Sequence, residues 1–235
     1  MKTTIVIPTY NEAENITKLV AALFSLNLPD LNILVVDDNS PDGTGQIAEE
    51  LGVQVLHRPG KMGLGSAYIQ GFQVAIQNGA ESVLQMDADF SHQPEKIPEL
   101  IEALKTCDVA LGSRYVPGGS LDERWPFWRK FLSGFGNFYA RTILGMKLKD
   151  VTGGFRLWRC ETLSAMPLQD IRSNGYIFQV EMAYAANKLG FTFKEVPIHF
   201  ADRRWGKSKM SFRIQIEAAI RTWQLPGMYR NIKKK

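Results

Sequence analysis

The chain has 235 residues and a formal net charge of +4, with 45% hydrophobic and 22% charged residues. This length and apolar fraction exclude a wholly disordered chain and suit one α/β domain with a sizeable core. The two cysteines, Cys107 and Cys160, are too few for a disulfide framework, and no His/Cys cluster has zinc spacing, so a reducing cytosol is expected.

The first part of the chain alternates between strand and helix signals. Short apolar and β-branched runs predict strands, and apolar residues at helical spacing predict the helices between them. The predicted strands are 3–8, 32–37, 53–56, 82–86 and 109–111, and the predicted helices are 13–26, 44–51, 63–77 and 94–104. Strands separated by helical stretches indicate βαβ units, and therefore a mostly parallel sheet flanked by helices.

The pattern changes from residue 115 onward. The predicted elements are a loop at 117–120, a long helix at 125–144, a strand at 153–158, a helix at 176–189, a strand at 191–200 and a helix at 211–224 that ends before Pro226. No internal repeat or linker interrupts this order. We therefore expect one α/β domain over 1–210, followed by a C-terminal basic amphipathic helix and tail over 211–235.

Polar clusters follow three of the predicted strands, at 8–12 (PTYNE), 37–40 (DDNS) and 87–89 (DAD). Ligands of parallel sheets bind beyond the carboxyl ends of the strands, so these clusters are expected to meet on one rim. Asp87 and Asp89 are the sharpest signal, because two carboxylates just past a buried strand suit Mg²⁺ or Mn²⁺ beside substrate phosphates. The alternative interpretation is a solvated acidic turn.

Other classes of site fit the sequence less well. Gly63 and Gly65 provide G-x-G without the full dinucleotide fingerprint, and they follow the third predicted strand rather than the first. No Walker sequence and no G-x-S-x-G elbow occurs. These features disfavour an NAD-dependent oxidoreductase. A plain RNA- or lipid-binding module would have no use for three acidic strand-end clusters, so no nucleic-acid partner is expected.

Five motifs occur in order: IPTYNE (7–12), VDDNSPDGT (36–44), MDAD (86–89), GSRY (112–115) and DRRWGKSK (202–209). On these motifs the chain resembles the family-two glycosyltransferases of GT-A (Rossmann-like) fold. More narrowly, segment 202–209 and TGGFR (152–156) resemble the dolichyl-phosphate (polyprenyl-phosphate) mannose synthases. The resemblance implies transfer of mannose from GDP-mannose to dolichyl or polyprenyl monophosphate by an inverting, metal-dependent displacement. The alternative is a polyprenyl-phosphate glucosyltransferase, or another family-two enzyme that uses a UDP-sugar.

The resemblance also implies a role for each motif. The nucleotide-sugar pocket would be lined by Pro8, Tyr10, Glu12, Asp37, Asp38 and Asp87. Mg²⁺ or Mn²⁺ would be held by Asp87, Asp89 and Ser91, although some relatives have Gln where this chain has Ser91, so either Ser91 or water would complete the shell. The catalytic set would comprise Asp89 and the phosphate-facing cations Arg114, Arg129, Arg203 and Lys209.

The charge pattern is compatible with an anionic acceptor. A hydroxyl acceptor would need a general base, whereas a phosphate monoester is already anionic and needs cations to position it. Residues 201–235 hold ten Lys and Arg against two acidic residues, while residues 1–200 are net negative. A basic segment of this kind suits phosphates or anionic lipid, or serves as a solubilising tail.

The predicted helix 125–144 has an aromatic face opposite Lys130 and Arg141. This pattern is typical either of an interfacial helix or of a helix packed in the core. No membrane-spanning helix and no signal peptide is predicted. We therefore expect peripheral contact with the cytoplasmic face of a membrane, directly or through a membrane-anchor subunit. The residues of the aromatic face are Trp128, Phe131, Leu132, Phe135, Phe138 and Tyr139.

Overall fold

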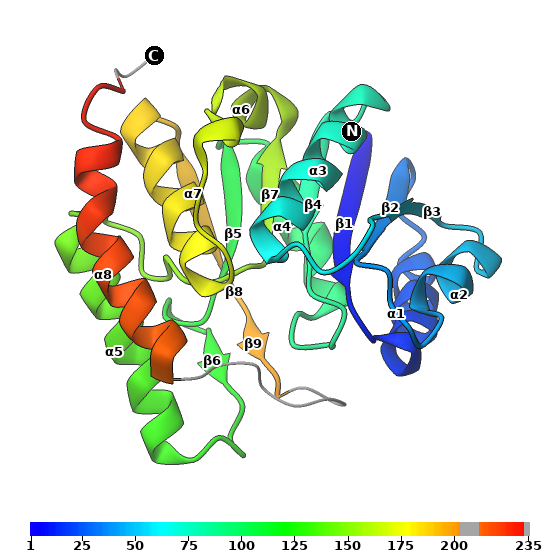
Figure 1. Cartoon of the computed structure of the whole chain (residues 1–235), viewed down its shortest axis with the longest axis horizontal. Coiled ribbons are helices and arrows are strands. Elements are labelled where there is room, and N and C mark those ends of the chain that lie inside the picture. Colours follow the sequence, from blue (N-terminus) through cyan, green and yellow to red (C-terminus); the bar gives the residue numbers. More distant parts are fainter. Residues whose placement is uncertain (203–211, 233–235) are drawn as a thin grey trace.

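The computed structural model describes residues 1–202 and 212–232 and contains a central seven-stranded sheet of order β3-β2-β1-β4-β7-β5-β8 (Figure 1). Neighbouring strands pair in parallel, except that β7 is antiparallel to both β4 and β5. The mostly parallel sheet expected from the sequence is therefore confirmed. The strands are β1 (Thr3–Thr9), β2 (Leu31–Asp37), β3 (Gln54–His57), β4 (Ser82–Gln85), β5 (Val109–Ser113), β7 (Arg156–Arg159) and β8 (Phe193–Pro197).

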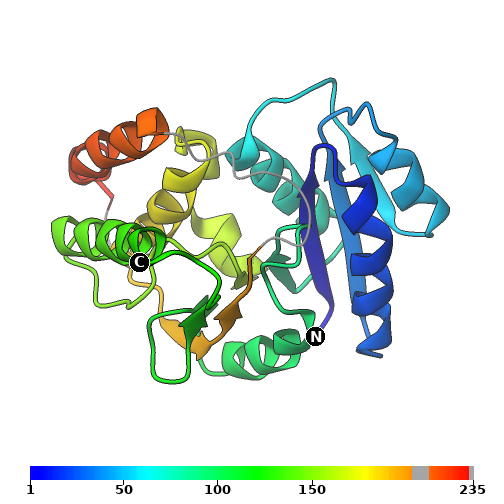
Figure 2. The ribbon, with the colours of Figure 1, turned by 90° about the horizontal axis from the view of Figure 1, so that it is seen from below.

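Helices cover both faces of this sheet (Figures 1 and 2). Alternate residues of a strand point to opposite faces, so β1 places Ile5 and Ile7 in one core and Val6 in the other. The first core is covered by α1 (Ala13–Ser25), α2 (Thr44–Glu50) and α4 (Ile97–Leu104), which follows a short 3-10 turn, η1 (Pro94–Lys96). The second is covered by α3 (Leu64–Gln77), α6 (Cys160–Ala165) and α7 (Tyr176–Leu189), with a second 3-10 turn, η2 (Leu168–Asp170), between α6 and α7.

Two further helices, α5 (Phe127–Ile143) and α8 (Phe212–Met228), lie side by side outside α7 (Figures 1 and 2). The end of α8 is fixed to α7, because the Tyr229 hydroxyl donates a hydrogen bond to the buried Glu181 carboxylate at 2.9 Å. Within the described residues, no helix is both long enough and apolar enough to cross a membrane. The domain division at residue 210 stays a prediction.

The outer side of α5 and α8 is apolar. The buried residues of α5 are Asn137 and Ala140, whereas its Phe and Trp residues are exposed, with Phe127 83% exposed, and Tyr139 is half-buried against α8. The interpretation of the aromatic stripe as core is therefore wrong for its exposed members. We define the apolar face as Phe127, Trp128, Phe131, Leu132, Phe135 and Phe138 on α5 together with Ile216, Ile220 and Trp223 on α8.

The predicted strand 191–200 is wrong as a single element. It divides into β8 and β9 (His199–Phe200), which pairs with β6 (Ser120–Leu121) in a separate two-stranded sheet. Pro197 is the last residue of β8, and the Ile198 N–H still donates to the Ser113 carbonyl of β5 at 3.1 Å before the chain leaves the sheet. The chain then crosses toward the loop after β5, where a strand rather than a simple loop begins at Ser120.

The predicted end of the last helix is also wrong, because α8 continues through Pro226 to Met228. A proline inside a helix removes one backbone hydrogen bond and crowds the preceding turn. Here that cost falls within the last turn of the helix. The same turn buries Leu225 fully, and Tyr229 immediately beyond it is 3% exposed. This packing against the second core holds the helical conformation past the proline.

Candidate active site

The loops after β1 and β2 are fastened together by the buried Asp37 carboxylate. Its Oδ1 accepts hydrogen bonds from the Thr9 hydroxyl at 2.9 Å and from the Ser40 hydroxyl at 2.6 Å. Its Oδ2 accepts from the Ser40 backbone N–H at 2.9 Å. These hydrogen bonds are internal to the protein, so Asp37 holds the loops after β1 and β2 together at the carboxyl edge of the sheet. A direct contact of Asp37 with nucleotide stays a prediction.

The same two loops are joined at a second set of contacts. The Glu12 N–H donates to the Thr44 hydroxyl at 3.0 Å, and the Ala13 N–H donates to the Asp42 carboxylate at 3.1 Å. Pro8, Tyr10 and Glu12 are half-buried along this seam. Three residues that the resemblance assigns to the nucleotide pocket are thus brought beside the loop that carries Asp37 and Asp38.

Asp38 forms a buried ion pair with Arg58, a residue that the sequence analysis missed. Asp38 Oδ1 lies 2.8 Å from Arg58 Nη1, although the two groups are not aligned as a hydrogen bond. Arg58 also donates to the Ser66 hydroxyl at 2.6 Å. Burial raises the pKa of Asp38, and the Arg58 charge opposes that effect. Arg58 directly follows β3. The expectation that polar residues just after a strand line the site, which selected Asp38, could therefore have identified Arg58 as well.

The turn after β4, residues 87–92, carries the paired carboxylates of Asp87 and Asp89, and we call it the carboxylate turn. Hydrogen bonds hold it from two sides. The Tyr68 hydroxyl of α3 donates to the Asp87 carboxylate at 3.0 Å, and the Asp87 backbone N–H donates to His92 Nδ1 at 3.1 Å. Asp89 Oδ1 accepts from the Ser91 N–H at 3.0 Å. Burial lowers the pKa of His92, while nearby carboxylates oppose this shift. Tyr68 carried no local sequence signal, because only the fold brings it to Asp87.

The donor atoms of this turn fit a hard divalent cation. The Ser91 hydroxyl oxygen is buried and has no hydrogen-bond partner among the described residues. The described part of the chain contains no group of three or more His, Cys, Asp or Glu side chains placed to hold a metal. The turn therefore offers the carboxylates of Asp87 and Asp89 and one hydroxyl. Such a set suits Mg²⁺ or Mn²⁺ when water and substrate phosphates complete the shell.

Arg114, just after β5, is engaged with an acid that the sequence analysis did not single out. Arg114 Nε lies 2.7 Å from Asp150 Oδ2, and Arg114 Nη2 lies 2.8 Å from Asp150 Oδ1, with both side chains buried. Burial acts to raise the pKa of Asp150, but the charge and hydrogen bonds of Arg114 lower it overall. The Phe200 ring lies between this pair and the carboxylate turn, with its centroid 5.2 Å from the Arg114 guanidinium and 5.7 Å from the His92 ring.

Arg129 lies in the first turn of α5. Its Nη1 is 3.1 Å from Asp202 Oδ1, and its guanidinium is 3.8 Å from the centroid of the Trp125 ring. Arg129 is half-buried, so it is more accessible than Arg114. Arg203 and Lys209 lie outside the described residues. The phosphate contacts that the resemblance implies for these four cations stay predictions.

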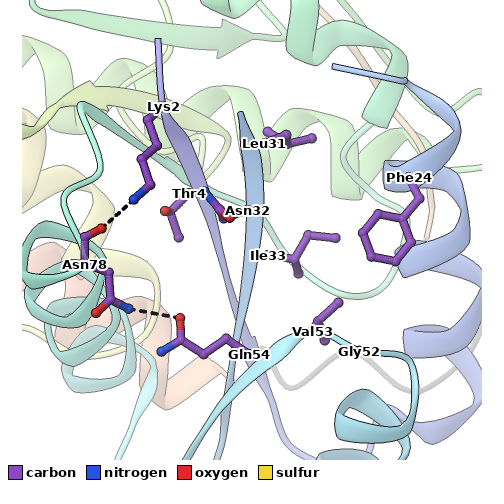
Figure 3. Close-up of a pocket in the computed structure, with 10 residues that line it drawn as sticks. All are labelled: Lys2, Thr4, Phe24, Leu31, Asn32, Ile33, Gly52, Val53, Gln54 and Asn78. Atoms are coloured by element: carbon purple, nitrogen blue, oxygen red, sulfur yellow. Dashed lines mark hydrogen bonds between the residues drawn. The ribbon is translucent and has the colours of Figure 1, made fainter. Parts of the chain in front are cut away.

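A hollow of about 370 Å³ lies away from this rim (Figure 3). It opens at the amino ends of β1, β2 and β3, next to Lys2, Asn32 and Gln54. Lys2 Nζ donates to the Asn78 carbonyl, and the Asn78 amide donates to the Gln54 side chain. The polar clusters follow the opposite, carboxyl ends of the strands, at the lower edge of the sheet in Figure 1. The hollow is therefore separate from the candidate site.

Comparison with known proteins places the whole chain in one family. Residues 4–166 match the family described as glycosyl transferase family 2. The undecaprenyl-phosphate mannosyltransferase of Micrococcus luteus is 44% identical over 240 residues, covering 99% of this chain and 98% of that protein. The polyprenol monophosphomannose synthase of Mycolicibacterium smegmatis is 44% identical over 217 residues, covering 89% of this chain and 81% of that protein.

The fold is shared with a solved enzyme. Glucosyl-3-phosphoglycerate synthase from Mycobacterium tuberculosis, in complex with Mn²⁺, UDP and phosphoglyceric acid, has a TM-score of 0.70 and 16% identity, covering 100% of this chain and 80% of that chain. Its complex with Mg²⁺ and UDP has a TM-score of 0.68 and 17% identity, covering 97% of this chain and 79% of that chain. The chain belongs to glycosyl transferase family 2, and it is a glycosyltransferase with the GT-A fold.

Proposed function

We propose that this glycosyltransferase moves mannose from GDP-mannose to a polyprenyl monophosphate. The observation that carries the proposal is the 44% identity, over 99% of the chain, to a protein named undecaprenyl-phosphate mannosyltransferase. In the reaction, a phosphate oxygen of the acceptor forms a bond to the anomeric carbon while the bond from that carbon to GDP breaks. GDP leaves with the electron pair, and the configuration at the anomeric carbon inverts.

The residues of the rim suit the donor side of this reaction. Asp87, Asp89 and Ser91 would hold Mg²⁺ or Mn²⁺ beside the diphosphate. A divalent cation bound there supplies stabilisation of the negative charge that grows on the departing GDP. Tyr10 and the buried Asp38, on the adjoining loops after β1 and β2, would form the wall of the nucleotide pocket. The Mn²⁺ and Mg²⁺ complexes of the solved glucosyl-3-phosphoglycerate synthase support this choice of metals.

The acceptor side needs cations rather than a general base. A phosphate monoester is already anionic, so no proton has to be removed from it before attack. Arg129 is the described cation best placed for this role, because it is partly exposed and lies at the start of α5. Arg114 is buried against Asp150, so we assign it the role of fixing the end of β5 beside the carboxylate turn. Arg203 and Lys209 would complete the acceptor site.

The test is a product assay with purified protein, Mn²⁺ and polyprenyl phosphate. GDP-mannose, UDP-glucose and other nucleotide-sugars are supplied one at a time, and the lipid product is identified by mass spectrometry. We expect a mannosylated lipid phosphate from GDP-mannose and at most a trace of product from UDP-sugars. Faster transfer from UDP-glucose would favour a polyprenyl-phosphate glucosyltransferase. Release of free sugar without a glycolipid would contradict the lipid acceptor.

We further propose that the apolar face of α5 and α8 contacts the membrane that contains the acceptor. Contiguous exposed apolar patches mark interaction surfaces, and aromatic residues are suited to a lipid interface. The Trp223 indole donates to the Tyr139 hydroxyl at 2.7 Å, which joins the two helices. Both helices begin at the edge where the sheet strands end (Figure 1). Peripheral docking at the cytoplasmic face would thus bring a lipid phosphate toward the carboxylate turn.

Basic residues and aromatic residues are expected to contribute separately to docking. Attraction to an anionic surface is worth about 1 kcal/mol per Lys or Arg and is screened by salt, whereas apolar insertion resists salt. We expect the protein to sediment with anionic liposomes and to be released only partly by high salt. The double change Phe131→Ser and Phe135→Ser should lower the salt-resistant partition coefficient by about a hundredfold or more, since each buried Phe contributes about 1.5–3 kcal/mol.

The matched control is Phe24→Ser, which removes an exposed aromatic side chain from α1. Helix α1 covers one face of the sheet, whereas α8 packs on α7, which covers the other face. Both variants should keep the melting temperature of the parent, because the three side chains are 52–62% exposed. A folded double variant that binds liposomes as the parent does would move docking away from this face. Binding that appears only after a membrane subunit is added would favour the anchor-subunit alternative.

A further inference from the structure

We propose that His92 is a positioning residue for the cation site, because its Nδ1 holds the backbone of Asp87 and so fixes the direction of the carboxylate turn. The inference rests on the proposed function only in taking Asp87 and Asp89 as the residues that hold the cation. It adds a residue that is neither a metal ligand nor a substrate contact. Its effect on the reaction would pass entirely through the backbone of the turn.

The His92 ring is fixed in place by its surroundings. The side chain is buried and stacks on Phe155, with ring centroids 5.0 Å apart and an interplanar angle of 12°. The Phe200 ring meets it edge-on at 5.7 Å. The Asp87 N–H points at Nδ1 at 3.1 Å, so this nitrogen carries a lone pair and the ring proton resides on Nε2. The packing of the His92 ring therefore holds its acceptor atom, Nδ1, in a fixed position.

The turn needs this acceptor because the sheet no longer supplies one. The last hydrogen bond that ties the end of β4 to β1 runs from the Met86 N–H to the Val6 carbonyl at 3.2 Å. One residue later the chain leaves the sheet, and Phe90 adopts a left-handed conformation with φ 60°. The hydrogen bond from the Asp87 N–H to His92 Nδ1 joins the beginning of the turn to its end. The Asp87 N–H is partly buried, and loss of its partner there costs free energy, so the conformation that keeps this hydrogen bond is favoured.

Asp87 is therefore restrained at two independent points. Tyr68 fixes the carboxylate from α3, and His92 fixes the backbone from the far side of the turn. Asp89 Oδ1 accepts a hydrogen bond from the Ser91 N–H within the same turn. Loss of the His92 acceptor would leave the Asp87 carboxylate anchored but free the segment that orients Asp89. Partners of this outer kind typically change metal affinity or activity by about 10–100-fold.

The test compares side chains that differ in one acceptor atom. His92→Asn places an amide oxygen at the position of Nδ1, whereas His92→Leu has the same branching without an acceptor. His92→Gln keeps the amide but moves its oxygen one bond further out. Mn²⁺ binding is measured by electron paramagnetic resonance of free Mn²⁺, with GDP and separately with UDP present. Melting temperature and metal-free nucleotide affinity are recorded for each variant.

We expect the Leu and Gln variants to raise the Kd for Mn²⁺ about tenfold or more, and the Asn variant to stay within about threefold of the parent. Metal-free nucleotide affinity should change little in all three. Equal weakening by Asn and Gln, or a parent-like Kd in a folded Leu or Gln variant, would overturn the proposal. If the Leu variant fails to fold, the Asn and Gln pair decides the matter.

The outcome is independent of the sugar and lipid. A parent protein that binds Mn²⁺ only with UDP, or that binds Mn²⁺ with GDP but makes no mannolipid, contradicts the proposed function. The ranking of Asn, Leu and Gln is still measured in that case. Conversely, a mannolipid made by the parent together with a flat ranking of the three variants leaves the proposed function standing and removes His92 from it.

Discussion

Asp89→Asn is expected to lower the rate of mannosyl transfer by about a thousandfold or more while the protein stays folded. Asp89 is 6% exposed and lies in the turn that offers two carboxylates and the buried Ser91 hydroxyl, which has no hydrogen-bond partner in the described part of the chain. Loss of one charged ligand removes several kcal/mol of charge stabilisation on the departing diphosphate, and about 4 kcal/mol corresponds to a thousandfold. The measurement is glycolipid formation over a series of Mn²⁺ concentrations.

The fold should survive this change, because the Asn amide oxygen can still accept the hydrogen bond from the Ser91 N–H. The matched control is Asp30→Asn, which removes an exposed carboxylate at a position with φ 61°, a conformation that Asn tolerates. The control variant should turn over as the parent does. Near-normal turnover of a folded Asp89→Asn protein at the same Mn²⁺ concentration would remove Asp89 from the cation site.

The carboxylate turn was predictable because its signal is local. Asp87 and Asp89 lie two residues apart after a buried run, and a parallel sheet places strand ends on one rim. Contacts between distant segments have no such signal. Tyr68 reaches Asp87 across 19 residues, and Arg114 reaches Asp150 across 36. The charges are visible in the sequence, but the pairing depends on how the helices pack on the sheet.

Arg114 illustrates the difference between residue type and environment. The resemblance implies that it faces phosphate, yet the structure places its guanidinium in a bidentate pair with buried Asp150. A buried charge needs a counter-charge, and that requirement is met within the protein. Asp150 lies two residues before the segment 152–156 and belongs to none of the motifs that carry the resemblance. An acid that precedes a T-G-G turn was the only local hint.

The aromatic stripe of α5 shows what periodicity leaves open. Helical spacing places Phe131 and Phe135 on one face, but an apolar stripe is equally typical of a core helix and an interfacial helix. The structure buries the opposite, less apolar face instead. There Asn137 Oδ1 accepts a hydrogen bond from the Val151 N–H at 2.8 Å, and its amide donates to the Lys149 carbonyl. The small Ala140 allows the close approach.

Asp150→Asn is expected to lower the free energy of unfolding by about 3–5 kcal/mol, as is typical when one partner of a buried ion pair is removed. Asp150 is fully buried, and Arg114 is 4% exposed. Asp150 also accepts hydrogen bonds from the backbone N–H groups of Arg114 at 3.1 Å and of Gly153 at 3.0 Å. An Asn amide retains one acceptor oxygen but removes the negative charge that faces the buried Arg114 guanidinium. Urea unfolding at pH 7 measures the difference, with Asp30→Asn as the surface control expected to change stability by less than about 0.5 kcal/mol.

The stability difference between parent and variant should also depend on pH in a defined direction. The pKa of Asp150 is lowered in the folded protein from its ordinary value of 3.8. A carboxylate with a lowered pKa stabilises the fold fully above the unfolded value, and the effect is lost as the pH falls through the folded value. The difference should therefore be constant between about pH 7 and pH 5 and should shrink below about pH 4. A difference under about 1 kcal/mol at pH 7, or one that grows on acidification, would show that the Arg114–Asp150 pair is not the source of this stability.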